Sequence, residues 1–562
     1  MSGVIILGAA IVIFLIAYVT YGSWLAKQWG VDPKRETPAH TEEDGVDFVP
    51  AKAPVLLGHH FSSIAGAGPI NGPIQAAIFG WVPVLLWIVI GGIFFGAVQD
   101  FSALFASIRH KGKSLGEVIE ENISYKSKVC FTVFAWLVLI LVVAAFADIV
   151  AGTFAGFTAN TDGEMVKNAA NGSVAMASML FIPLAVGFGF LNRKNVNLGV
   201  STIVGVLLLA LCIFVGLKSP IYFSKTAWLV VIFIYIFIAS VAPVWILLQP
   251  RDYLNSFLLY FMMIAAAIGI FFTNPNVQLK AFTGWNIGGQ TLFPFLFITV
   301  ACGAVSGFHS LIGSGTTSKQ LNSEKDAKMI GYGSMLIECV LAVIALIAVG
   351  YLTSDGAYAE IGTPPVVFAT AISTFFANMG MGDMAVTTMK TIILLAISAF
   401  ALTSLDTATR LGRFLFQELF ASKKNGEKNI LSNMYVATVI TIACAALLTI
   451  AGYQKIWALF GACNQLVSVP AFLAVSCWLK RIGKNNRMFY FPMFFMLAAT
   501  LSTLVLTFKN NVLKLAGGTG QALVEGLQCV LIVPIVVLAV IMAIDGIRTL
   551  LERALKRHKK WM

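Results

Sequence analysis

Charged residues are scarce in this sequence. Asp, Glu, Lys and Arg together make up 11% of its 562 residues, whereas a soluble domain typically contains about 25% of them. Hydrophobic residues make up 58%. Because hydrocarbon offers a charge no partner, this composition excludes a soluble globular domain. It predicts a protein that crosses a membrane many times.

Cysteine and histidine are also rare. The eight cysteines fall in or beside apolar runs without any Cys-x-x-Cys pair, so we expect them to be reduced and buried. The six histidines form no HExxH motif, and we expect no metal site. The formal charge of +12 comes from basic residues that lie mostly in short loops between apolar runs. This distribution follows the positive-inside rule and argues against nucleic acid as a partner.

Apolar windows recur along the whole chain, each about 20 residues long, which as a helix crosses a ~30 Å hydrocarbon core. They predict fifteen spans, near residues 3–22, 58–79, 82–108, 129–156, 173–191, 196–216, 227–248, 254–273, 291–315, 328–352, 385–409, 431–452, 454–479, 488–508 and 524–547. A further stretch, 363–382, contains two prolines and ends in a glycine-rich turn, which favours a re-entrant or surface hairpin. The predicted fold class is an all-α polytopic membrane protein.

Basic residues are distributed unevenly between alternate loops. With the N-terminus outside, the cytoplasmic loops and tail carry 30 Lys and Arg, and the outer segments carry 7. If 363–382 also crossed the membrane, the basic segment 410–430 would lie outside, which the positive-inside rule disfavours. We therefore expect a multi-pass protein of the cell membrane with its N-terminus outside and its C-terminus in the cytoplasm.

Two predicted spans contain residues that interrupt a helix. Span 58–79 has a glycine- and proline-rich run at 66–73, and span 291–315 has Gly-Ser-Gly at 313–315. Glycine costs a helix entropy, and proline lacks the backbone N–H. Since lipid cannot satisfy freed backbone groups, such breaks persist only against protein or a polar cavity. The simpler alternative is that these residues only allow helices to pack closely.

The two interruptions match each other. His60 precedes the first and His309 the second, and seven spans separate them. Because this offset is odd, the second copy crosses the bilayer in the opposite direction. This is the inverted-repeat arrangement of secondary transporters, which bind substrate near the midplane between discontinuous helices.

The repeat divides the chain into four expected parts. They are 1–57, with the first span and a cytoplasmic loop; 58–290, the first repeat with extra helices; 291–480, the second repeat; and 481–562, two peripheral helices and a basic tail.

Residues beside the two interruptions are expected to line the substrate site. They are His60, Ser62, Gly66, Gly68 and Asn71 from the first span and Ser306, His309 and Ser310 from the second. Helix N-termini that follow a break supply partial positive charge, which favours a small carboxylate as substrate.

Few charged side chains lie within the spans, where each costs at least ~2.5–3.5 kcal/mol. We expect Asp100 either to carry a proton or to fix the structure. Asp406 lies four residues before Arg410, so an ion pair within one helix is the favoured interpretation and ion coupling the alternative. We expect Asp148 to be a hydrated residue at a helix end, and Glu338 to be a packed acid, protonated or hydrogen-bonded, rather than a carrier.

Two further groups could take part in ion coupling. The hydroxyls of Thr403 and Ser404, together with carbonyls near Gly66, could form an oxygen site for Na⁺. His60 and His309 could titrate near physiological pH, which suits coupling to protons. The coupling ion is therefore H⁺ or Na⁺, and no other cofactor is expected.

Five segments resemble the carbon starvation (CstA) transporter family. They are GHHFSSIAGAGPINGP at 58–73, GAVQDFSALFASIRHKGKSLGE at 96–117, CGAVSGFHSLIGSGTTSKQ at 302–320, LTSLDTATRLGRF at 402–414 and LFGACNQLVS at 459–468. The resemblance implies a LeuT-type fold and uptake of small carbon sources, which are pyruvate with protons for some members and peptides in an older assignment. It also implies that Thr403 and Ser404 lie where related transporters hold a cation against span 58–79.

We therefore expect a secondary active transporter that imports a small carboxylate, with pyruvate as the best single candidate, by alternating access. A peptide transporter of the same fold is the alternative. A channel or an intramembrane enzyme is the alternative from another class, but the sequence contains no catalytic constellation. The oligomeric state is left open.

Overall fold

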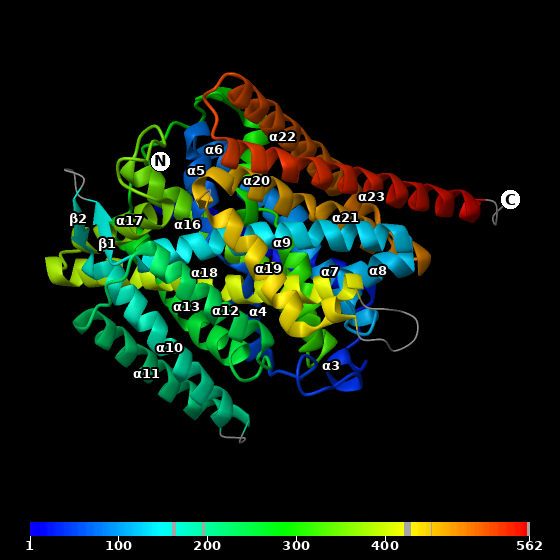
Figure 1. Cartoon of the computed structure of the whole chain (residues 1–562), viewed down its shortest axis with the longest axis horizontal. Coiled ribbons are helices and arrows are strands. Elements are labelled where there is room, and N and C mark those ends of the chain that lie inside the picture. Colours follow the sequence, from blue (N-terminus) through cyan, green and yellow to red (C-terminus); the bar gives the residue numbers. More distant parts are fainter. Residues whose placement is uncertain (160–163, 194–196, 421–428, 451, 559–562) are drawn as a thin grey trace.

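The structure, a computed structural model, describes residues 1–159, 164–193, 197–420, 429–450 and 452–558. These residues form a bundle of long helices with two very short β-hairpins (Figure 1). In the hairpins, β1 (Phe157–Ala159) pairs antiparallel with β2 (Met165–Lys167), and β3 (Asn286–Ile287) with β4 (Gln290–Thr291). The expected all-α polytopic fold is confirmed.

The α-helices of the described residues are α1 (Gly3–Ala17), α2 (Ser23–Trp29), α3 (Pro38–Thr41), α4 (Ala53–Ile64), α5 (Gly68–Ala76), α6 (Trp81–Gly91), α7 (Ala97–Arg109), α8 (Leu115–Asn122), α9 (Tyr125–Phe154), α10 (Ala169–Arg193), α11 (Leu198–Lys218), α12 (Lys225–Val241), α13 (Leu248–Thr273), α14 (Phe297–Thr299), α15 (Gly307–Gly315), α16 (Ser334–Leu352), α17 (Pro364–Asn378), α18 (Asp383–Phe420), α19 (Met434–Thr449), α20 (Tyr453–Leu466), α21 (Ser468–Arg481), α22 (Tyr490–Ala516) and α23 (Leu527–His558). Short π-helical turns at Tyr18–Gly22, Gly92–Gly96, Leu292–Leu296, Lys328–Gly333 and Ala522–Gly526 extend several of them. Short 3₁₀ turns lie at Ala77–Phe79, Ala301–Gly303, Thr317–Lys319, Glu324–Asp326, Ile430–Ser432 and Arg487–Phe489.

Eleven helical segments of the described chain are long and apolar enough to cross a membrane. Each overlaps one of the fifteen predicted spans. The other four predicted spans are the two interrupted ones and two whose helices, α12 and α19, are shorter. The protein is a multi-pass membrane protein, and the exact number of crossings stays a prediction.

The core of the bundle lies along α9 and α18, which pack against each other for much of their lengths. The side chain of Ser124 accepts a hydrogen bond from the backbone N–H of Ser127 and thereby caps α9 at its N-terminus. Every side chain of α9 from Val138 to Ala151 is buried. A helix that is apolar on all sides is expected to lie inside a membrane bundle, where its neighbours cover it.

The first predicted break is confirmed. α4 ends at Ile64 and α5 begins at Gly68, so the interruption falls at residues 65–67 and overlaps the start of the predicted run at 66–73. Gly72 explains part of this pattern, because a Cβ there would lie 2.3 Å from the carbonyl oxygen of Val300. The run therefore both ends one helix and lets the next approach a foreign backbone closely.

The second predicted break is misplaced. Residues 313–315 belong to the regular helix α15, and the chain is interrupted earlier, at 304–306, before His309 rather than after it. The Oδ1 atom of Asn464 accepts a hydrogen bond of 2.8 Å from the backbone N–H of Phe308 and thereby caps the start of α15. A Cβ at Gly315 would lie 2.3 Å from the Leu411 side chain. Close helix packing, the alternative interpretation, therefore explains this glycine.

The two broken helices lie side by side and run in opposite directions. α5 is the second half of the first broken helix, and it packs against Cys302 in the first half of the second broken helix. A Cβ at Gly68 would lie 2.6 Å from the Cβ of Cys302. At the other end, α4 meets the turn after α15, where the Nδ1 atom of His60 lies 2.8 Å from the Oγ1 atom of Thr317. This crossed pairing of halves requires antiparallel chains. The wider inverted repeat and the four-part division stay predictions.

Met1 and the end of α23 lie at opposite ends of the bundle (Figure 1). The N-terminal ammonium donates a 2.8 Å hydrogen bond to the side chain of Asn276. At the far end, Lys480 donates to the carbonyl oxygen of Leu550 in α23. The side of the membrane on which each end lies stays a prediction.

Segment 363–382 contains α17, which has 15 residues and a length of about 22 Å at 1.5 Å per residue. α17 packs against α5, α16 and α18 and is shorter than the ~30 Å hydrocarbon core. Its turn into α18 includes Gly380 with a φ of +87°. These features suit the predicted hairpin.

Two smaller expectations need correction. All eight cysteines are free, as predicted, but Cys130, Cys212, Cys444 and Cys529 are only partly buried. Asp148 is not a hydrated end residue, because its side chain is 4% exposed and lies 2.7 Å from the ammonium of Lys225.

Candidate functional site

Two sets of buried polar side chains flank the broken helices. The first, called here the His309 trio, consists of Asp100 on α7, His309 on α15 and Glu338 on α16. The second, called the Arg251 cluster, contains His59, Tyr235, Arg251, Asp252, Thr403 and Asp406. Neither set could exist in a membrane without internal partners, because each isolated charge would be expensive.

The His309 trio has no exposed surface. The Nδ1 atom of His309 lies 2.8 Å from a carboxylate oxygen of Asp100, which is a hydrogen bond. Its Nε2 atom lies 3.6 Å from a carboxylate oxygen of Glu338, which is within ion-pair range but too long for a hydrogen bond. The histidine therefore bridges two acids from different helices.

Amide side chains fix the backbone beside the trio. Gln99 donates a hydrogen bond of 2.6 Å to the carbonyl oxygen of Ser306, and Asn464 donates one of 3.1 Å to the hydroxyl of Ser306. Ser310 donates to the carbonyl oxygen of Gly307 within the first turn of α15. The start of α15 is thus held by α7 and α20, two elements distant in sequence.

Several polar atoms next to the first break are buried without a partner. The Nε2 atom of His60 and both amide atoms of Asn71 have no hydrogen-bond partner among the described residues. Both side chains are 0% exposed. Buried polar groups are ordinarily hydrogen-bonded, so these atoms are available to a further polar partner.

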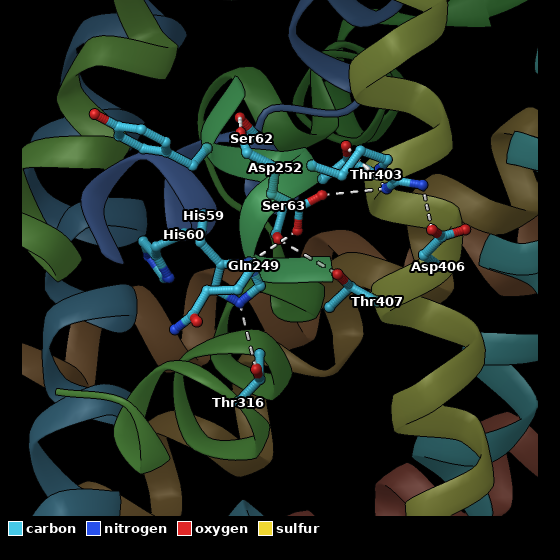
Figure 2. Close-up of polar contacts among 12 residues, drawn as sticks. His59, His60, Ser62, Ser63, Gln249, Asp252, Thr316, Thr403, Asp406 and Thr407 are labelled. Carbon is cyan, nitrogen blue, oxygen red and sulfur yellow. Dashed lines mark hydrogen bonds and ion pairs between the residues drawn. The ribbon is translucent and has the colours of Figure 1, made fainter. Parts of the chain in front are cut away.

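The Arg251 cluster joins α4, α12, α13 and α18. The guanidinium of Arg251 contacts the carboxylate of Asp406 and the hydroxyl of Tyr235, and donates 3.1 Å hydrogen bonds to Thr403 and Asp252. Asp252 in turn lies 2.8 Å from the Nδ1 atom of His59. Figure 2 shows His59 on α4 and Thr403 and Asp406 on α18 around this polar region.

The expected ion pair between Asp406 and Arg410 is wrong. Arg410 contacts Asp47 at 3.2 Å and donates to the carbonyl oxygens of Ala239 and Ala242. Asp406 instead pairs with Arg251. The predicted spans place Arg251 in a cytoplasmic loop, but the residue is only 1% exposed. Both residues are arginines, but the donors of Arg410 go to Asp47 and two carbonyl oxygens, so Arg251, 155 positions away, is the partner of Asp406.

The residues proposed for a cation site do not all come together. The hydroxyl of Ser404 donates a 2.9 Å hydrogen bond to the carbonyl oxygen of Ser63, and a Cβ at Gly66 would lie 2.9 Å from that hydroxyl. Thr403 faces Arg251 and Asn255 instead. The guanidinium therefore supplies a positive charge beside Thr403, one of the three residues at which Na⁺ was expected.

The remaining predicted residue of the first span, Ser62, donates a 3.1 Å hydrogen bond to the carbonyl oxygen of Asp252 and so lies beside the Arg251 cluster (Figure 2).

Among the described residues, no three His, Cys, Asp or Glu side chains are arranged to hold a metal ion.

A cavity of about 290 Å³ opens on the side of the basic loops. Leu311, Ser314 and Gly315 of α15 line it together with Lys319 and Phe48. The Lys319 ammonium lies 5.2 Å from the ring centre of Phe48. Burial lowers the pKa of Lys319 below its ordinary value. The cavity therefore has a basic side chain beside the C-terminal end of α15.

Sequence reasoning missed Tyr235, Arg251, Asp252 and Asn464 as site residues. Arg251 and Asp252 follow Pro250 where an apolar run ends, a pattern that resembles an ordinary loop. Asn464 lies within an apolar span. The available signal was that polar amides and charges inside or at the edge of spans mark functional positions by default.

Comparison with known proteins places the chain in a family. The family model described as carbon starvation protein CstA matches residues 2–367 and 359–503. The chain belongs to the CstA family. It is 33% identical over 533 residues to a Bacillus subtilis protein named peptide transporter CstA, a match that covers 87% of each chain. It is 38% identical over 378 residues to the Escherichia coli pyruvate/proton symporter BtsT, covering 65% of this chain and 51% of that one.

The fold of this CstA family member resembles that of a solved transporter. A mutant of the Eremococcus coleocola manganese transporter matches 90% of this chain and 99% of its own, with a TM-score of 0.50 and 12% sequence identity. At this identity the likeness concerns the fold alone. Membership of the CstA family makes the chain a membrane transporter rather than an enzyme.

Proposed function

We propose that this transporter imports a small carboxylate, best represented by pyruvate, together with a proton across the cell membrane. The observation that carries the proposal is the antiparallel pair of broken helices with unpaired, fully buried polar atoms of His60 and Asn71 beside the break. Discontinuous helices of this kind hold substrate in secondary transporters, and their N-termini favour anions. The name of the Escherichia coli relative, a pyruvate/proton symporter, agrees with this substrate and ion.

Protons are preferred to sodium because of Arg251. Its guanidinium contacts Thr403, whose hydroxyl was expected to be one of the Na⁺ ligands, and the nearby carboxylate of Asp406. A fixed positive charge there repels a second cation. The His309 trio, by contrast, offers three titratable side chains in a buried place. Sodium coupling remains the alternative that the transport experiment must exclude.

A peptide transporter is the second candidate, because several relatives carry that name. The two substrates share the carboxylate but differ in size and in the peptide's ammonium group. Both candidates fit an alternating-access mechanism in which one helix bundle rocks against the other.

The test is uptake by purified protein in proteoliposomes. We expect labelled pyruvate to enter by saturable counterflow, unlabelled small carboxylates to compete, and dipeptides to have little effect. An inward proton gradient should accelerate uptake, and a sodium gradient should not. Competition by dipeptides without competition by lactate or acetate would favour the peptide candidate. Uptake that neither saturates nor shows counterflow would indicate a channel.

A further inference from the structure

We infer that Glu338 of the His309 trio is the group that carries the transported proton, with His309 as its buried partner. The inference rests on the proposed proton-coupled function and deepens it by naming the site of the proton. It also revises the expectation that Glu338 is only structural.

The charge of the trio requires an extra proton. Two carboxylates and one imidazolium sum to a charge of −1, and within the described part of the chain no Lys or Arg forms an ion pair with any of the three. All three side chains are 0% exposed. Because an uncompensated buried charge is strongly unfavourable, the trio is neutral in its resting state. Neutrality needs one proton more than the imidazolium already holds.

Geometry assigns this proton to Glu338. Asp100 is tied to His309 by a 2.8 Å hydrogen bond. Neither carboxylate oxygen of Glu338 has a hydrogen-bond partner among the described residues. An ionised carboxylate without donors is costly to bury, whereas a protonated one costs far less. The described conformation therefore corresponds to the proton-loaded state, with Asp100 ionised and Glu338 protonated.

The surroundings of Glu338 contain few other titratable groups. Cys302, beside the second break, and Cys339, its neighbour on α16, interact with it electrostatically, and Asp100 does so through the trio. His60 on α4 interacts with His309. The proton thus sits between both broken helices and α16, where its arrival or departure acts on the position of α15.

The coupling step follows from charge balance. Glu338 takes a proton from the outer solution as its O–H bond forms, which makes the trio neutral. On release to the cytoplasm that bond breaks, the proton leaves to water and the trio returns to −1. The ionised Glu338 then attracts the imidazolium of His309 more strongly, which favours a different position of α15. One proton crosses in each cycle, and the anionic substrate crosses with it.

The test compares Glu338→Gln with Asp148→Asn in proteoliposomes. Asp148 is a matched control, since it is also a buried membrane carboxylate but pairs with Lys225 outside the trio. A one-unit inward pH gradient should drive wild type and Asp148→Asn to accumulate pyruvate about tenfold. Glu338→Gln, which is permanently neutral, should keep counterflow but accumulate no pyruvate above the external concentration. Tenfold accumulation by Glu338→Gln would overturn the inference.

A second variant covers the case in which Glu338→Gln abolishes counterflow. Glu338→Asp keeps an ionisable group but moves it away from His309, so the pH at which counterflow is half-maximal should shift relative to wild type and to Asp148→Asn. An unchanged pH profile in Glu338→Asp would refute the assignment. Absence of gradient-driven uptake in wild type, by contrast, would refute the proposed proton coupling itself.

Discussion

Single residues of this protein find their partners at long range. Arg251 pairs with Asp406 across 155 positions, and His309 pairs with Asp100 across 209. Sequence reasoning could identify Asp100, His309 and Asp406 as expensive intramembrane groups, because that cost depends only on composition and position. It could not find their partners, because helix periodicity offers only neighbours three or four residues away.

Removing Arg251 should destabilise the protein. In Arg251→Met the carboxylate of Asp406 stays buried and loses its charged partner, so we expect the free energy of unfolding to fall by about 3–5 kcal/mol. The double variant Arg251→Met/Asp406→Leu should recover most of this loss. The measurement is the thermal unfolding midpoint in detergent.

A matched control is Arg548→Met. Arg548 forms an exposed pair with Glu552, and such pairs contribute about 0–1 kcal/mol. Equal midpoints for wild type and Arg251→Met would show that the pair with Asp406 contributes nothing.

Replacing Asn71 should weaken substrate binding without unfolding the protein. Asn71→Ala removes two unpaired polar atoms that we assign to the substrate, and losing a hydrogen bond to a charged ligand costs about 1.5–3 kcal/mol. We therefore expect the half-saturation concentration for pyruvate to rise roughly 10-fold or more. Asn378→Ala, which loses only an exposed hydrogen bond to Tyr351, should leave it unchanged. A wild-type value in Asn71→Ala would remove Asn71 from the site.

At the scale of elements, the two breaks differ in how well sequence predicts them. The first break overlaps the start of its own glycine- and proline-rich run, so local rules place it to within a few residues. The second lies at 304–306, where Asn464 from α20 caps the next helix. The start of α15 is set by a residue more than 150 positions away, so the sequence around the second break gives little indication of where the helix begins. The more conspicuous glycine run at 313–315 serves helix packing instead.

Close contact between the broken helices should be essential. A Cβ in Gly72→Ala would lie 2.3 Å from the carbonyl oxygen of Val300, so the two helices must separate. Overpacking of this kind costs about 1–3 kcal/mol. We expect Gly72→Ala to lower the thermal midpoint and to reduce pyruvate counterflow severely. Gly152→Ala meets no atom within 4 Å and should behave as wild type. Full counterflow in Gly72→Ala would contradict the packing described for α5.

At the scale of the whole molecule, the loop between α2 and α4 covers one end of the bundle. Its Asp47 pairs with Arg410 at 3.2 Å, and the backbone N–H of Ala51 donates to the carbonyl oxygen of Gln320. The pKa of Asp44 in this loop lies below its ordinary value. Partial burial raises this pKa, but the hydrogen bonds that the carboxylate accepts from the N–H groups of Val46, Phe48 and Asp47 together lower it by more. The same end carries Lys113 and Arg481.

This arrangement predicts sidedness. Because the basic end should face the cytoplasm, an epitope inserted at Gly45 should be protected in spheroplasts, and one at Gly288 should be accessible to antibody. Both positions are exposed turns with positive φ, so insertions there should be tolerated. Antibody access at Gly45 but not at Gly288 would reverse the proposed orientation.

The central claim, that anion and proton cross together at the antiparallel broken helices, is tested most directly by proton movement itself. Proteoliposomes loaded with a pH-sensitive dye, without any imposed gradient, should acidify inside when pyruvate is added outside, and protein-free liposomes should not. The acidification should be lost in Glu338→Gln while labelled pyruvate still exchanges. Entry of labelled pyruvate into wild-type vesicles with no accompanying acidification would contradict the account.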